Sequence, residues 1–78
     1  MYFMKLTSYD NWIPCNAVSI HGAKQEASKH FKDDINDNIL IGYGIDADNI
    51  ISTYQGHRIT KIQWDKSPTK YENKYEQS

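Results

Sequence analysis

The clearest helical pattern in the chain is Ser19-Ile20-His21-Gly22-Ala23-Lys24-Gln25-Glu26-Ala27-Ser28-Lys29-His30-Phe31, and the expected fold is arranged around this helix. Ser19 is suited to begin the helix, since its hydroxyl can accept a hydrogen bond from an N–H of the first turn. Lys32 suits the end, where cations meet the negative end of the helix dipole. Apolar residues at spacings of 3, 4 and 4 form one helix face: Ile20, Ala23, Ala27 and Phe31.

Extended segments precede and follow this helix. Residues 1–9 alternate in polarity and predict a first strand. Residues 12–18 predict a second, in which Pro14 lacks an N–H donor and favours an edge position or a break. After the helix we expect strands at residues 39–45, 50–55 and 58–64, with turns at 46–49 and 56–57.

These elements predict an α+β fold, with one helix packed on a curled antiparallel sheet of about five strands, in the order β-β-α-β-β-β. Short connections join antiparallel neighbours, and 78 residues leave room for one domain. We expect that domain to span residues 1–64. Residues 65–78 are mostly polar and predict a loosely ordered C-terminal tail.

Both faces of the predicted sheet carry large apolar groups. With even-length turns, Tyr43 and Tyr54 share a face with five isoleucines, at positions 39, 41, 45, 50 and 59. Leu40, Ile51, Ile62 and Trp64 point the other way. One short helix can cover only one face. The other must be covered by a sheet that curls on itself, by a second subunit or by a partner.

Composition excludes several classes of function. A net charge of -1 is neither that of a simple basic nucleic-acid binder nor that of a bulk DNA mimic, so any role of charge depends on local patches. The single cysteine, Cys15, cannot form an internal disulfide or a cysteine metal cluster. The chain has no apolar run of membrane-spanning length and no signal-peptide pattern, so we expect a cytoplasmic protein without membrane contact.

No residue pattern predicts catalysis or a cofactor. Asp46, Asp48 and Asn49 look superficially like a calcium loop, but the glycine and the distant bidentate glutamate are missing, so we interpret them as turn residues. Nothing in the spacing of Cys15 and His21 or His30 requires a nucleophile and its base, which would also need an orienting group and an oxyanion site. We interpret Cys15 as a small buried side chain. We therefore expect a protein that is not an enzyme and holds no metal.

Basic and aromatic side chains are the better candidates for contact with a partner. Helix positions Lys24, Lys29 and Lys32 and strand positions Arg58 and Lys61 can form a local basic patch, although such lysines often serve solubility alone. Tight binding also needs buried anchors, and Tyr43 or Tyr54 would serve if their sheet face is open. The predicted partner-binding residues are Lys24, Lys29, Lys32, Tyr43, Tyr54, Arg58 and Lys61.

Residues 17–29 follow the pattern Ala-x-Ser-(Ile/Leu)-x-x-Ala-Lys-x-x-Ala-Ser-Lys, which resembles the helix start of a small phage-encoded anti-CRISPR protein of the type I-F group. In that group the helix precedes three antiparallel strands, and the last strand ends near a tryptophan, as here at Trp64. The chain departs from the pattern at Gln25, where the group carries an arginine. The likeness is firmest over the helix.

This resemblance implies a non-enzymatic phage inhibitor of host defence. Such a protein binds the CRISPR RNA-guided surveillance complex at the backbone subunits that line the guide RNA, and it blocks hybridisation of target DNA. Lys24 and Lys29 are the matched contact positions. Two other hypotheses stay open from the residues themselves. One is a small nucleic-acid-binding module that uses the helix lysines and the tyrosines. The other is a homodimeric accessory protein that pairs through an isoleucine-rich sheet face.

Overall fold

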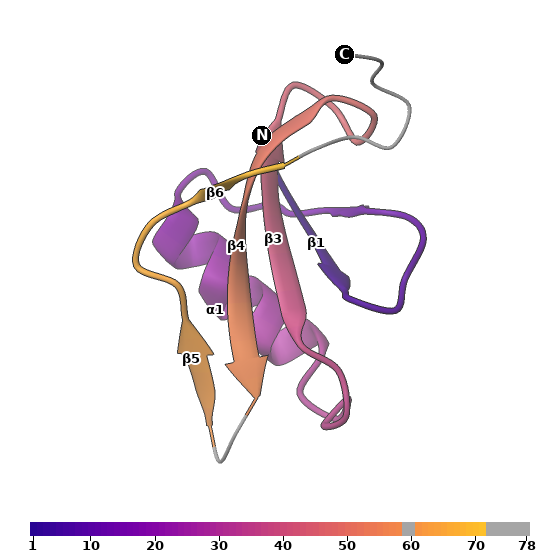
Figure 1. The fold of residues 1–78 in the computed structure, drawn as a ribbon, viewed down its shortest axis with the longest axis vertical. Coiled ribbons are helices and arrows are strands. Elements are labelled where there is room, and N and C mark those ends of the chain that lie inside the picture. The colour runs from indigo at the N-terminus through magenta and orange to yellow at the C-terminus, as the bar shows by residue number, and fades with distance from the viewer. Residues whose placement is uncertain (59–60, 72–78) are drawn as a thin grey trace.

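The computed structural model describes residues 1–58 and 61–71. It shows one helix lying across one face of an antiparallel sheet (Figure 1), so the predicted α+β class is confirmed. The elements in chain order are β1 (Tyr2–Leu6), β2 (Ile13–Pro14), α1 (Ile20–His30), β3 (Ile39–Gly44), β4 (Ile50–Arg58), β5 (Ile62–Trp64) and β6 (Thr69–Lys70).

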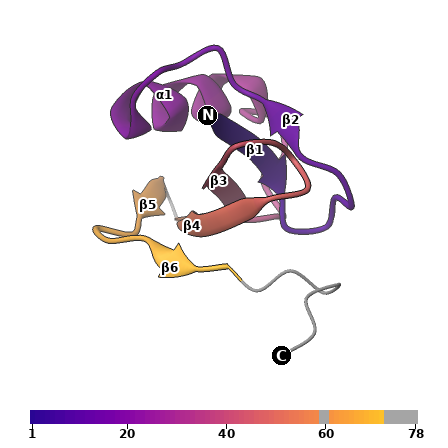
Figure 2. The ribbon, with the colours of Figure 1, turned by 90° about the horizontal axis from the view of Figure 1, so that it is seen from above.

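The strands are ordered β2-β1-β3-β4-β5, and every pairing is antiparallel. The short β2 lies at one edge, where the missing N–H of Pro14 costs no interior ladder bond. β6 pairs with β4 further along the same side as β5. Seen from above, α1 lies over the curled sheet on one side and β6 lies on the other (Figure 2).

The helix forms as its sequence pattern predicts. The Ser19 hydroxyl accepts a hydrogen bond from the Gly22 N–H at 3.2 Å, and the chain leaves the helix at Phe31. Its predicted apolar face is buried against the sheet. The core between the two layers consists of Met4, Leu6, Ala23, Ala27, Phe31, Ile39 and Ile41. In the described part of the chain, no helix is both long enough and apolar enough to span a membrane.

The last hairpin differs from the prediction. Gly56 and His57 do not form a turn; they continue β4, which runs to Arg58. Arg58 pairs with Ile62 and Gly56 pairs with Trp64, so the connection spans the three residues 59–61. Gly56 is required here as a strand residue, because a Cβ at this position would lie 2.9 Å from the indole of Trp64.

This odd-length loop reverses the predicted face of β5. Ile62 and Trp64 pack against the core beneath the helix rather than on the opposite face. Ile50 is also reversed, because the register shifts between Tyr43 and Gly44 and pairs Ile50 directly with Gly44. Ile50 therefore lies on the far face, where its side chain approaches Gly42. The predicted positions of residues 59 and 60 lie outside the described residues.

The far face is covered in part by the chain itself. The indole of Trp12, from the connection between β1 and β2, lies over Gly42 and makes an edge-to-face contact with Tyr71 at 5.9 Å. The ammonium of Lys5, whose side chain is nearly buried, lies 4.8 Å from the Trp12 ring and donates to the Tyr9 carbonyl. Trp12 therefore shields the far face beside Gly42.

Residues 69–71 bond to β4, within the segment from residue 65 that we expected to be a loosely ordered tail. Ser52 and Thr53 pair with Lys70 and Thr69, and the Tyr71 N–H donates to the carbonyl of Ile51 at 3.1 Å. Main-chain hydrogen bonds hold this segment, so a polar sequence does not prevent it from adding to the sheet. The rest of the predicted tail, residues 72–78, lies outside the described residues.

Candidate binding groove between α1 and β5

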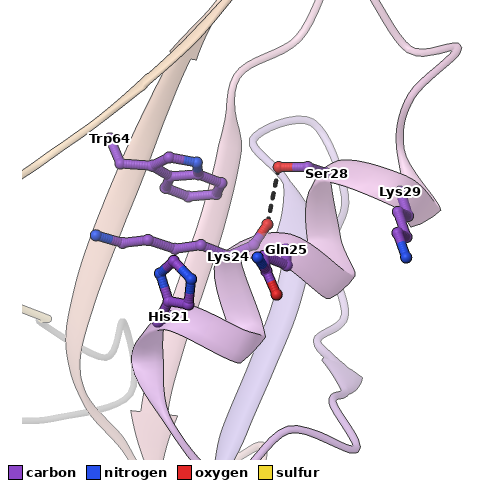
Figure 3. A pocket seen from close by; sticks show the side chains of 6 residues that line it. All are labelled: His21, Lys24, Gln25, Ser28, Lys29 and Trp64. Carbon is purple, nitrogen blue, oxygen red and sulfur yellow. Dashed lines mark hydrogen bonds between the residues drawn. The ribbon is translucent and has the colours of Figure 1, made fainter.

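A shallow groove of about 480 Å³ runs between the exposed side of α1 and the end of β5. Two elements build it: five positions of the helix form one wall, and a single indole forms the other (Figure 3). Its lining residues are His21, Lys24, Gln25, Ser28, Lys29 and Trp64. We call this feature the α1–β5 groove.

The helical repeat explains why these side chains gather. Positions three and four apart on a helix are neighbours on its surface, and His21, Gln25 and Ser28 follow that spacing. Ser28 lies beside the buried face formed around Ala23 and Ala27, and His21 and Gln25 lie further round, on the exposed side of the helix. The hydroxyl of Ser28 donates to the carbonyl of Lys24 at 2.8 Å, which fixes it on the helix wall (Figure 3).

Lys24 bridges the helix and the sheet. Its Nζ atom donates to the main-chain carbonyl of Asp65 at 3.3 Å. The same ammonium lies 4.9 Å from the ring centroid of Tyr54 and 5.8 Å from that of Trp64. Cation–π contacts and a charge-assisted hydrogen bond therefore hold this side chain. Lys24 forms the floor of the groove and links α1 to β4 and β5.

Two neighbours position Trp64: the backbone of Gly56 in β4, and Asp65, the next residue in the chain. A Cβ at Gly56 would lie within 3.0 Å of the Trp64 ring, so the indole rests directly on the β4 backbone. The Asp65 carboxylate accepts the Gln55 N–H at 3.1 Å and lies 3.2 Å from Nε2 of His57. These contacts hold the chain after Trp64 against β4 and fix the indole as the second wall.

The groove is locally cationic although the whole protein carries a charge of -1. Its lining holds two lysines and no carboxylate. The nearest acidic residue on the helix, Glu26, instead accepts the N–H groups of Asn16 and Ala17 at 2.9 to 3.1 Å. The Asp65 carboxylate is engaged by Gln55 and His57. Both nearby carboxylates are therefore engaged by other groups, and among the described residues neither forms an ion pair with a lysine of the groove.

The structure brings together only part of the predicted partner-binding set. Lys24 and Lys29 share the α1–β5 groove. Tyr54 lies under Lys24, and Tyr43 is 41% exposed with its ring 5.0 Å from that of Tyr2. Lys32 and Lys61 are exposed and lie outside the groove lining.

Arg58 forms hydrogen bonds within the protein. Its guanidinium donates to the carbonyl of Phe31 at the end of α1 and to the carbonyl of Asp37 at 3.1 Å. Its own N–H donates to the side chain of Asn38 at 3.1 Å. A cation at this position also meets the negative end of the helix dipole. Arg58 therefore ties the segment after α1 to β4, at a place apart from the groove.

The residues considered in the sequence as catalytic or calcium-binding candidates have different surroundings. Burial, and the nearby carboxylate of Glu26, raise the pKa of Cys15 from 9.0 to about 11, which is opposite to the shift that a thiolate nucleophile needs. His30 packs its ring against Phe31 at 4.7 Å. The Asp46 carboxylate accepts hydrogen bonds from the Asp48 N–H and the Asn49 side chain, as expected of a turn. Among the described residues, no group of three or more potential ligands can hold a metal ion.

Sequence reasoning missed His21, Gln25, Ser28 and Trp64 as groove residues. The first three carry a usable signal, because their spacings of four and three residues place them along one side of the helix. Trp64 has no such signal. The sheet face on which it lies depends on the position and length of the last hairpin loop, and the sequence predicted that loop at the wrong residues.

No family model matches this chain, and no curated protein or solved structure shows significant similarity to it.

Proposed function

We propose that this protein is a non-enzymatic phage inhibitor that binds a host defence complex through the α1–β5 groove. The proposed target is the CRISPR RNA-guided surveillance complex, at the backbone subunits that line the guide RNA, and binding blocks target DNA. The protein would act in the host cytoplasm, where such a complex works. The target follows from the resemblance of residues 17–29 to the type I-F group.

One observation carries the proposal. Lys24 and Lys29, the two positions matched by the resemblance, line the same groove. They are five residues apart, and the same groove holds the side of an indole, which is the kind of anchor that concentrates binding energy at interfaces. A surface that combines cations with an aromatic wall is a suitable site for a protein partner.

The geometry weighs against the nucleic-acid-binding alternative. Stacking platforms need open aromatic faces beside a basic groove. Here the face of Tyr54 carries the Lys24 ammonium at 4.9 Å, and the ring of Tyr43 lies against Tyr2. The ring of Trp64 lies between Gly56 and Lys24. Bases would find these rings already engaged.

A direct test uses purified type I-F surveillance complex and labelled target DNA in a gel-shift assay. Preincubation with excess protein is expected to abolish the shift of target DNA, and the protein is expected to co-elute with the complex in gel filtration. Unchanged DNA binding together with separate elution would overturn the proposed function. Loss of the DNA shift without co-elution would also contradict it, because the proposed inhibitor acts as a bound partner.

A further inference from the structure

We infer that the α1–β5 groove takes an acidic, extended protein segment, with carboxylates at the lysines and an apolar side chain against the indole edge. This inference rests on the proposed function in its choice of a protein partner, and it adds the chemistry of the segment that is bound. Three properties of the groove support the inference: the positive charge of its lysines, the contacts that already engage the Trp64 ring, and the polar side chains along its helix wall.

The rim provides a cation that is open to a ligand. Lys29 is exposed, and among the described residues it makes no ion pair. Lys24 lies deeper and is fixed by Asp65 and the two rings. The groove therefore offers one exposed and one fixed positive charge with no lining carboxylate to compete for them. Its charge complements glutamate or aspartate side chains.

The aromatic wall favours a protein segment over a nucleic acid. The backbone of Gly56 and the side chain of Lys24 lie against the Trp64 ring. The indole is half-buried, so only part of the ring is accessible in the groove. An aliphatic side chain can pack against such a ring without intercalating. A base would have to displace Lys24 from the ring and break its bond to the Asp65 carbonyl.

The helix wall supplies polar groups at intervals that suit an extended chain. His21, Gln25 and Ser28 lie along the groove beside the lysines (Figure 3). Gln25 is exposed, and its amide can donate to a carboxylate or to a main-chain carbonyl. Residues three and four apart are about 5–6 Å from one another on a helix, and alternate side chains on one face of a strand are separated by about 6–7 Å. Polar groups at alternate positions of an extended segment therefore match the spacing of His21, Gln25 and Ser28, while Lys24 and Lys29 are five residues apart.

The test is an NMR titration of the intact protein with a short capped peptide of alternating glutamate and leucine. Indole N–H signals of the two tryptophans separate the surfaces, because Trp64 lines the groove and Trp12 lies on the far face. We expect saturable shifts of the Trp64 indole and of the α1 amides near Lys29, with Trp12 unmoved. The corresponding lysine–leucine peptide and an oligothymidylate are the controls, and neither is expected to shift Trp64.

Two charge-reversed variants complete the test. Lys29→Glu changes the groove, and Lys32→Glu makes the same change on an exposed residue outside the lining. Peptide affinity is expected to fall about tenfold in Lys29→Glu and to stay near wild type in Lys32→Glu. Equal losses in the two variants, shifts confined to other surfaces, or preferential binding of the oligothymidylate would overturn the inference.

The two proposals fail in different ways. If the acidic peptide occupies the groove but the surveillance complex is neither bound nor blocked, only the proposed function fails. If the complex is bound and blocked but the peptide leaves Trp64 unshifted, only the inference about the groove fails.

Discussion

The Nζ atom of Lys24 donates a hydrogen bond to the main-chain carbonyl of Asp65 at 3.3 Å, which joins the middle of α1 to the end of β5. The lysine that a resemblance marks as a partner contact is thus also a structural bridge. Any experiment that changes Lys24 must separate the two roles, and Lys29 is the better position for testing contact because it is exposed.

Lys24→Met tests the structural role. Methionine retains most of the aliphatic stem but loses the ammonium, its hydrogen bond and its contacts with two rings. We expect the free energy of unfolding to fall by about 1 kcal/mol. Urea denaturation measures this, with Lys32→Met as the matched control, because Lys32 is exposed and should change stability little. Equal stability of Lys24→Met and wild type would show that the bridge contributes nothing.

Arg58→Ala is expected to destabilise the fold by about 2 kcal/mol, because it removes donors to two main-chain carbonyls at the end of α1. Amide hydrogen exchange should speed up at His30 and Phe31 before the rest of the helix, since the tie lies at that end. Lys61→Ala, at an exposed cation in the same hairpin, serves as the control. Helix exchange that is identical in Arg58→Ala and wild type would contradict the role of this clamp.

Gly56→Ala should displace the indole of Trp64. The added Cβ would lie 2.8 Å from Ile62 and 2.9 Å from the ring, so the side chains must shift, at a cost of about 1–3 kcal/mol. The Trp64 indole signal should move while that of Trp12 stays. Gly42→Ala is the matched variant, because its Cβ would lie 3.0 Å from Trp12 instead. The same pattern of indole shifts in both variants would show that Gly56 does not position Trp64.

These glycines show which parts of the fold could be predicted from the sequence. The helix was predictable because its cap and its apolar spacing are local, and the structure retains both. The last hairpin was not, because Gly56-His57 resembles a turn when it is considered alone. Gly56 is a strand residue whose missing side chain admits Trp64, and that contact depends on a residue eight positions away. The same error placed Trp64 on the wrong face and hid the second wall of the groove.

The candidate site was predictable only in its helix half. Lys24 and Lys29 were marked by sequence, and their neighbours on the helix follow from the same repeat. Arg58 and Lys61 were grouped with them by charge, yet Arg58 lies against the end of α1. The pairing of Thr69 and Lys70 with β4 could not be predicted from the sequence. Main-chain groups form this pairing, so the polar side chains of the segment show no strand pattern.

Cys15 gives a pH-dependent prediction. Its pKa of about 11 leaves roughly a hundredfold less thiolate near pH 8 than a thiol with a pKa of 9.0. Alkylation by iodoacetamide should therefore be about a hundredfold slower in the native protein than in urea, as measured by mass spectrometry. Glu26→Gln should speed the native reaction, because it removes the nearby negative charge. Equal native and unfolded rates would contradict the raised pKa.

The same shift sets the direction of a stability change. Between about pH 9 and pH 11 the unfolded chain releases the thiol proton while the native protein keeps it, so the free energy of unfolding falls as the pH rises. Replacing Cys15 by alanine should remove this part of the alkaline dependence. A Cys15→Ala variant whose stability falls just as steeply over that range would contradict the assignment.

The most direct test of the central claim is the dissociation constant of three proteins for the purified type I-F surveillance complex, measured side by side by biolayer interferometry. The proteins are wild type, Lys29→Glu and Lys32→Glu. We predict binding by wild type, an affinity about tenfold weaker for Lys29→Glu and an affinity within about twofold of wild type for Lys32→Glu. Equal affinities for the two variants, or no binding by wild type, would contradict the claim that the α1–β5 groove is the contact surface for this complex.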